Sequence, residues 1–216
     1  MIGSLTRGKQ MDKKTTISND TTSSNPVDVE VKPLVWFRHS PTIGIFLCLL
    51  FILSIVGLYY DIRSIAFIIV VIVMTFFHWM GVKKHFQADS NPGLVVSTQP
   101  TLVAVSTDLT RGVGSYPAIK IIKCSKLKGV HVGDMLPTVA SYQNYEELDF
   151  PFWPNFNPIP VRYATDDKNT INKAMQSYSK SQLQNLKRYL KQIEPPYEEG
   201  LYLIYTEDSD WNESEH

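Results

Sequence analysis

Few side chains in this 216-residue chain have the type and spacing that catalysis requires. A Ser-His-Asp arrangement would have to use His131, which lies beside a predicted turn. Four aspartates could offer oxygen ligands to Mg²⁺ or Ca²⁺, although Asp134 is typical of a turn and Asp166 of a helix cap. These four are Asp108, Asp134, Asp166 and Asp167. No phosphate-binding glycine loop, HExxH or CxxC motif occurs, so we expect no metal and no cofactor and assign no catalytic residue.

Four lysines form the most specific charged pattern. On a helix with 100° per residue they fall within about 40° of one another. They are Lys173, Lys180, Lys187 and Lys191. Such a stripe is ordinary for a solvated helix face, and its functional interpretation is attraction to an anionic membrane surface. Nucleic acid is not an expected partner, because residues 89–216 hold twelve Lys and Arg against sixteen Asp and Glu.

A second candidate surface is the proline-rich segment 150–160, FPFWPNFNPIP. Its prolines exclude a regular helix and disfavour a central strand, so the sequence predicts an extended loop. The aromatic residues could line a ligand pocket or contact a partner, or they could pin the loop onto its own core. They are Phe150, Phe152, Trp153 and Phe156.

Two uncharged apolar runs must position these surfaces. The run 41–60 has twenty residues, about 30 Å of helix, which is long enough to cross a bilayer. The second run reaches a spanning length over 64–82. Neither run has a polar face, which disfavours a buried soluble hairpin, and the first begins too far along the chain for a signal peptide. The sequence therefore predicts a transmembrane hairpin.

The charges that flank the hairpin predict its orientation. Basic residues precede the first run, and Lys83 and Lys84 follow the second, whereas the connecting turn carries only Arg63 against Asp61. Positive charge is enriched on the cytoplasmic side of membrane proteins. We expect a multi-pass protein with both termini in the cytoplasm.

Beyond the hairpin, β-like runs separated by turn residues occupy 94–98, 102–108, 118–124 and 138–143. Short strands are also predicted at 161–164 and 201–205. Because no helical pattern interrupts the first four, we expect an antiparallel sheet or partial barrel.

One long helix is predicted over 168–194, before Pro195. Its apolar stripe consists of Ile171, Met175, Tyr178, Leu186, Leu190 and Ile193.

These patterns divide the chain into five parts. We expect a disordered cytoplasmic tail over 1–38, a transmembrane hairpin over 39–82, a juxtamembrane linker over 83–90, a cytoplasmic α+β domain over 91–205 and an acidic tail over 206–216.

Several segments together resemble a bacterial domain family of unknown function. They are NPGLVVS (91–97), TDL (107–109), YPAIKI (116–121) and VGDMLPTVA (132–140). The resemblance covers roughly residues 90–205. It implies a membrane-associated bacterial domain and transfers no catalytic residue.

The expected fold class is α+β: a two-helix transmembrane hairpin, then a small antiparallel sheet or partial barrel with one long C-terminal helix. The expected function is that of a membrane-anchored cytoplasmic binding or scaffold domain. Its partners would be the lipid bilayer and a protein or a second copy of the chain. A membrane-tethered, hydrolase-like enzyme at the cytoplasmic face is the alternative.

Overall fold

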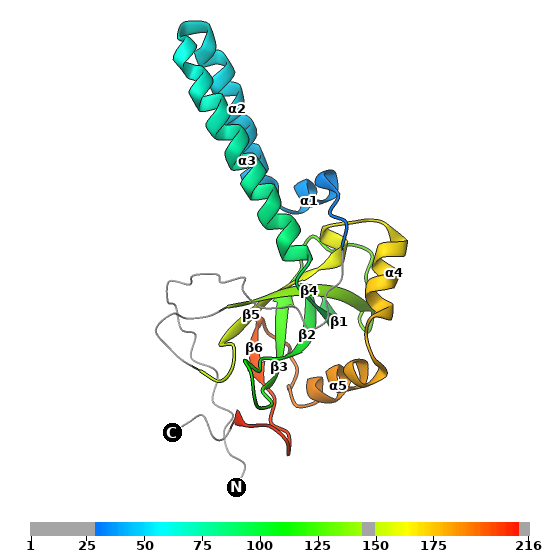
Figure 1. The fold of residues 1–216 in the computed structure, drawn as a ribbon. Coiled ribbons are helices and arrows are strands. Elements are labelled where there is room, and N and C mark those ends of the chain that lie inside the picture. The colour runs from blue at the N-terminus through cyan, green and yellow to red at the C-terminus, as the bar shows by residue number, and fades with distance from the viewer. Residues whose placement is uncertain (1–28, 144–149, 212–216) are drawn as a thin grey trace.

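The computed structural model describes residues 29–143 and 150–211, and a long helical hairpin rises from a compact α+β domain (Figure 1). The hairpin consists of α2 (Pro41–Tyr60) and α3 (Ile65–Phe86), joined by the 3-10 turn η1 (Ile62–Ser64). With 20 and 22 residues, the helices are about 30 and 33 Å long. Both are long and apolar enough to cross a membrane, and the two predicted apolar helices are thus confirmed.

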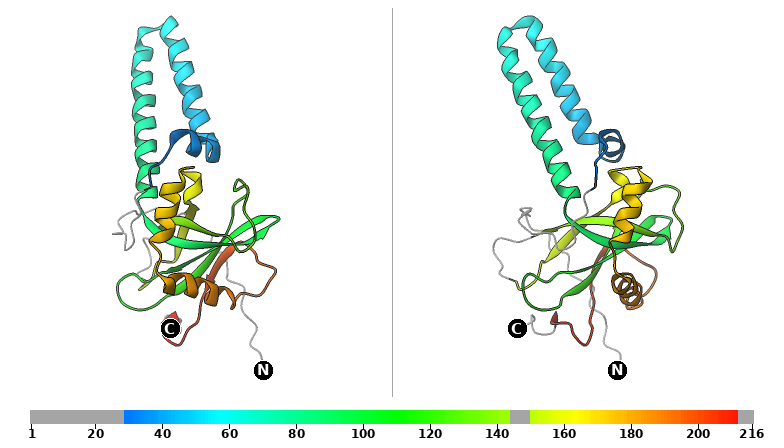
Figure 2. Two further views of the ribbon diagram at one scale, coloured as in Figure 1. Left: turned by 90° about the vertical axis from the view of Figure 1, so that its right-hand side faces the viewer. Right: turned by 45° about the vertical axis from the view of Figure 1, so that its right-hand side comes forward.

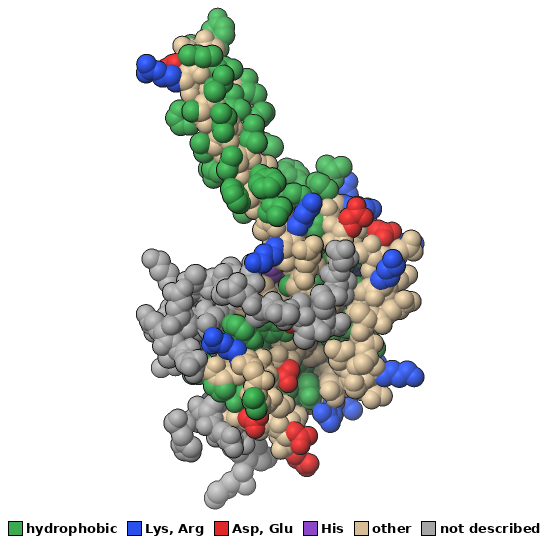
Figure 3. Space-filling view, viewed as in Figure 1, with side chains coloured by type: hydrophobic (Ala, Val, Ile, Leu, Met, Phe, Trp, Pro, Cys, Tyr) green, Lys and Arg blue, Asp and Glu red, His purple; other side chains and the backbone are tan. Residues whose placement is uncertain are grey.

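The surface of the hairpin is almost entirely apolar. In α2 only Leu47 and Ser54 are buried, and Figure 3 shows hydrophobic side chains covering the visible face of both helices. Two hydroxyls well inside the spans donate to backbone carbonyls of their own helix: Ser54 to Leu50 at 2.7 Å and Thr75 to Val71 at 2.8 Å. A surface of this kind suits lipid, where unsatisfied polar groups are costly.

The domain is built on one curled antiparallel sheet of six strands. Their order is β5-β4-β1-β2-β3-β6, and every neighbouring pair is antiparallel. The strands are β1 (Asp89–Thr98), β2 (Thr101–Asp108), β3 (Pro117–Lys123), β4 (Met135–Gln143), β5 (Asn155–Pro160) and β6 (Gly200–Leu203). The predicted antiparallel sheet or partial barrel is thus confirmed.

The fifth strand lies elsewhere than predicted. Residues 161–164 do not form a strand, because Val161–Tyr163 is the 3-10 turn η2, and β5 comes from the proline-rich segment instead. β5 is an edge strand, where Pro158 and Pro160 need no N–H for a further neighbour. The prolines of segment 150–160 correctly predicted that it is not a central strand. The prediction that the whole segment is a loop was wrong, because its second half forms β5.

Lys120 holds the curl of the sheet together. It lies on β3, yet its Nζ donates to the Asn155 Oδ1 at 2.9 Å, the Phe156 carbonyl at 2.6 Å and the Asn157 Oδ1 at 3.2 Å, all on β5. Burial lowers the pKa of Lys120 to about 8, against a weaker opposing effect of Glu199. The three bonds connect strands that are not neighbours in the sheet order, so the sheet closes into a half-barrel.

The predicted long helix is two helices, α4 (Lys168–Gln176) and α5 (Lys180–Leu190). The break follows from a capping box, in which the Ser179 hydroxyl accepts from the Gln182 N–H and the Gln182 side chain accepts from the Ser179 N–H. The apolar stripe still faces inward, but α4 packs on β4 whereas α5 packs on β1, β2 and β3. The Ser-x-x-Gln pattern was readable in the sequence and was missed.

Two predicted boundaries also differ. The linker expected over 83–90 does not exist as such, because α3 continues to Phe86 and β1 begins at Asp89. The acidic tail begins with ordered structure: the Trp211 side chain is buried between Tyr116 and Phe152, with ring centroids 5.0 and 4.9 Å away. Residues 1–28 and 212–216 of the predicted tails lie outside the described residues.

Candidate functional site

A short helix, α1 (Pro33–His39), lies across the base of the hairpin (Figure 2). The sequence placed these residues in a disordered tail, which was wrong. Pro33 suits the first turn of a helix, and the Lys32 N–H donates to the Ala164 carbonyl at 2.8 Å. The Lys32 ammonium also contacts the Asp166 carboxylate at 2.6 Å. Contacts with the distant residues 164–166 therefore fix α1.

Three rings attach α1 to the rest of the molecule. Trp36 meets Phe86 of α3 edge to face, with centroids 5.5 Å apart, and His39 stacks on Tyr163 of η2 at 3.6 Å. The ring of Phe37 covers Gly44 of α2 so closely that a Cβ on Gly44 would lie 2.6 Å from a ring carbon. α1 thus connects both membrane helices to the domain.

His39 is held neutral at this position. Desolvation and, to a smaller extent, the positive charge of Lys126 lower its pKa to about 4. The Lys126 ammonium donates to the His39 carbonyl. Because the imidazole is stacked and poorly solvated, its protonation would weaken the contact with Tyr163.

A buried apolar cluster lies between the hairpin and the domain. Together with the rings that hold α1, it forms what we call the junction. Only Gln87 and Ala88 separate α3 from β1, and the Phe86 side chain is fully buried. The buried members of the cluster are Val29, Val31, Val82, Phe86, Val139, Val161, Ala164 and Ala174. Because they come from the N-terminal segment, α3, β4, η2 and α4, the hairpin is packed onto the domain rather than tethered to it.

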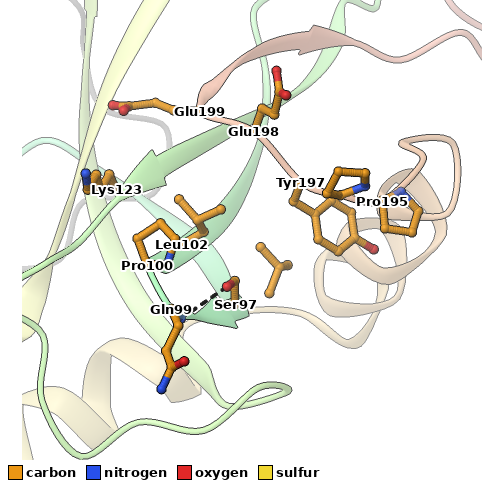
Figure 4. Close-up of a pocket in the computed structure, with 11 residues that line it drawn as sticks. Ser97, Gln99, Pro100, Leu102, Lys123, Pro195, Tyr197, Glu198 and Glu199 are labelled. Carbon is orange, nitrogen blue, oxygen red and sulfur yellow. Dashed lines mark hydrogen bonds between the residues drawn. The ribbon is translucent and has the colours of Figure 1, made fainter.

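A groove of about 580 Å³ lies between the β1–β2 turn and the segment that leads into β6 (Figure 4). Val96, Leu102 and Tyr197 provide apolar surface, and Glu198 and Glu199 are exposed at its edge. The other lining residues are Ser97, Gln99, Pro100, Lys123, Pro195 and Pro196. No lining residue belongs to the hairpin or α1. Sequence reasoning missed this groove because three distant segments form it.

The lysine stripe is divided by the break between the helices. Lys173 lies on α4, whereas Lys180, Lys187 and Lys191 belong to α5 and its C-terminal cap. All four are exposed, but α5 lies on the side of the domain away from the hairpin (Figures 1 and 2). The prediction of one continuous helix, which motivated the membrane interpretation, was therefore wrong. Membrane contact by these lysines stays an untested prediction.

The aromatic residues of segment 150–160 pack largely on the protein itself. Phe156 is fully buried in β5, and Phe152 lies against Tyr116 and Trp211. Phe150 stacks on Phe152, and Trp153 lies near Tyr142 and Arg111. These contacts favour the packing interpretation, although a partner contact by the half-buried rings is not tested.

The candidate catalytic groups do not come together. The His131 side chain is 87% exposed and lies 3.6 Å from the Asp134 carboxylate in the same loop. Asp167 caps α4 by accepting from the Thr170 N–H, and Asp108 accepts from Thr110 and Tyr116 within a turn. Within 29–143 and 150–211, no group of three His, Cys, Asp or Glu side chains could hold a metal ion.

Fold and junction define a class: a membrane protein in which a two-helix hairpin is packed onto a half-barrel α+β domain. The chain belongs to the family described as protein of unknown function (DUF3239), whose model matches residues 80–194. This finding confirms the resemblance to a domain family of unknown function. The match runs from the last turns of α3 to just beyond α5.

Among solved structures, the chain is similar to the crystal structure of a candidate membrane protein from Corynebacterium diphtheriae. The two are 19% identical, and the match covers 54% of this chain and 100% of the other, with a TM-score of 0.45. No curated protein matches the chain.

Proposed function

We propose that this protein is a membrane-anchored binding protein whose half-barrel domain stands on the cytoplasmic face at a fixed height and orientation. The observation that carries the proposal is the junction, where α3 passes into β1 with only two intervening residues and Phe86 is fully buried. A domain that only needed confinement to the membrane could hang on a mobile linker. A packed junction instead determines which face of the domain points away from the bilayer.

Charge supports the cytoplasmic placement. Arg38 precedes α2, and Lys83 and Lys84 lie in the last turn of α3, whereas the turn between the helices carries Arg63 beside Asp61. The excess of basic residues at the open end of the hairpin predicts that this end is cytoplasmic. Both termini would then lie on that side.

The groove is the candidate binding surface. Its apolar residues could accept an aliphatic or aromatic side chain, and Glu198 with Glu199 would attract a neighbouring basic residue. We propose a basic segment of a protein partner, or of a second copy of the chain, as the occupant. The separation of the groove from α1 and the hairpin would leave it accessible in the membrane.

A photo-crosslinking experiment tests this function in membranes. With benzoylphenylalanine in place of Tyr197, we expect a defined crosslinked product whose mass distinguishes a second copy from another protein. Replacing both Glu198 and Glu199 with Lys should abolish the product. Val113, which is 91% exposed at a loop tip, is the control position. The same product from Val113, or a product unaffected by the two Lys substitutions, would contradict the groove as the binding surface.

A further inference from the structure

The outer face of α1 is apolar, and nothing within residues 29–143 and 150–211 covers it. Leu34 is 77% exposed, and Phe37 remains 42% exposed even though part of its ring lies on Gly44. Figure 3 shows hydrophobic side chains continuing from the base of the hairpin over α1. Two such side chains on a seven-residue helix would be unfavourable in water.

The connection to α2 determines what surrounds this face. Ser40 alone separates α1 from α2, so α1 lies at the level where the first span begins. α1 runs across the hairpin rather than along it (Figure 2). A short helix in this position, with an apolar side and neighbouring basic groups, has the character of an interfacial helix.

The exposed charges at the base of the hairpin are predominantly basic. Arg38, Lys83 and Lys84 are exposed there, and the Lys83 ammonium lies 5.8 Å from the Trp79 ring centroid. Lys32 and Lys126 bring the basic groups to five, against the three acidic groups Glu30, Asp166 and Asp167. The formal charge of the whole chain is zero, so this excess is local.

We propose that α1 is a lipid-binding helix of the junction. Leu34 and Phe37 insert into the boundary between headgroups and acyl chains, and Arg38, Lys83 and Lys84 bind the phosphates of anionic lipids. These five residues form what we call the collar. The inference rests on the proposed function, because the hairpin must be in the bilayer for the collar to reach it. The collar would set the tilt of the domain as well as its height.

Depth-dependent quenching tests the collar in the full chain. Cys48→Ser and Cys124→Ala remove the two native thiols. Leu34→Cys then provides a single thiol to which an NBD fluorophore is attached. Val113→Cys is the matched exposed apolar position away from the membrane, and Ile72→Cys, 54% exposed in α3, is the position within the bilayer. Nanodiscs contain phosphatidylcholine alone or with phosphatidylglycerol, together with a lipid that carries a doxyl quencher near the headgroup.

We expect quenching at Leu34→Cys to exceed that at Val113→Cys by about threefold or more. It should increase with phosphatidylglycerol and decrease when salt is added or Arg38 is changed to Gln, because exposed charges are screened. Equal quenching at Leu34 and Val113 would overturn the proposal, and equal quenching in both lipid mixtures would overturn its anionic component.

Two further outcomes distinguish a failure of the lipid-binding proposal from a failure of the proposed function. Protection of Leu34→Cys from aqueous iodide without lipid quenching would mean that protein covers the helix, which would overturn the proposal in favour of a second copy. Absence of quenching at Ile72→Cys would contradict the membrane anchor itself, and therefore the proposed function.

Discussion

One face of the half-barrel sheet is covered differently at its two ends. At the junction, buried residues from α3, η2 and α4 pack on the sheet, and the rings of α1 close the edge. Toward the other end of the same face α5 covers β1, β2 and β3 with Leu186 and Leu190, and beside it the groove remains open. The chain thus uses one end of this face for attachment and leaves the other accessible.

Because of this difference, anchoring can be assigned to the residues of the junction and binding to those of the groove. The junction contains fully buried Phe86 and buried Tyr163, neither of which a soluble partner could reach without unfolding the site. The groove has Glu198 and Glu199 at its edge, both exposed. Changes at either site should therefore leave the other intact, which makes the comparison testable.

The largest expected effect is at the junction core. Phe86→Ala removes a fully buried ring between α1 and the sheet, and we expect it to lower the free energy of unfolding by about 3–5 kcal/mol. Near-UV circular dichroism of the purified chain in detergent, recorded against urea, measures the loss. Phe67→Ala is the control, because Phe67 lies on the same helix and is 67% exposed. Equal losses for the two variants would contradict a packed junction.

The contact of α1 with α2 should respond to a single methyl group. Gly44→Ala places a Cβ 2.6 Å from the Phe37 ring, so the ring must move, at a cost of about 1–3 kcal/mol. Tryptic cleavage at Arg38 should become faster. Gly81→Ala is the matched control, because a Cβ there meets nothing within 4 Å. If the two variants were cleaved at the same rate, the Phe37–Gly44 contact would have no role in holding α1.

A smaller effect is expected at the other end of this face of the sheet. Ser179→Ala removes the capping box of α5 and should lower the free energy of unfolding by about 1 kcal/mol. Cleavage at Arg38 should stay unchanged, since α5 does not contact α1. Exposed Ser125, in the turn after β3, provides the control substitution. Faster cleavage of α1 in Ser179→Ala would show that the two ends are coupled.

The last effect is absent at neutral pH: it is a response to acid that is confined to the junction. The pKa of His39 falls from its ordinary value of 6.5 to about 4 in the folded chain, so between these values the released α1 binds more protons than the docked one. Docking of α1 should be fully stable above pH 6.5 and weaken as the pH falls toward 4. The mobility of a nitroxide at Leu34→Cys should rise over this range in the chain with His39 and stay constant in His39→Phe. A constant mobility in both would contradict the account of His39.

Sequence alone predicted the hairpin, the antiparallel sheet and the inward-facing stripe, because each depends on a local periodicity. It failed where distant segments decide the structure. α1 is held by Ala164, Asp166 and Tyr163, which lie more than a hundred residues away, so a window around Trp36 contains too few contacts to predict it. β5 required the edge position that accommodates its prolines, and an edge is a property of the assembled sheet.

The central claim is that the junction fixes the domain relative to the hairpin, and a distance measurement tests it most directly. Nitroxides at Arg63→Cys in the hairpin turn and Lys187→Cys on α5, in the chain with Cys48→Ser and Cys124→Ala, would be measured by double electron–electron resonance in nanodiscs. We predict one narrow distance distribution that becomes broad in Phe86→Ala. A broad distribution in the chain with Phe86 intact would show a domain that swings on its anchor, and would contradict the claim.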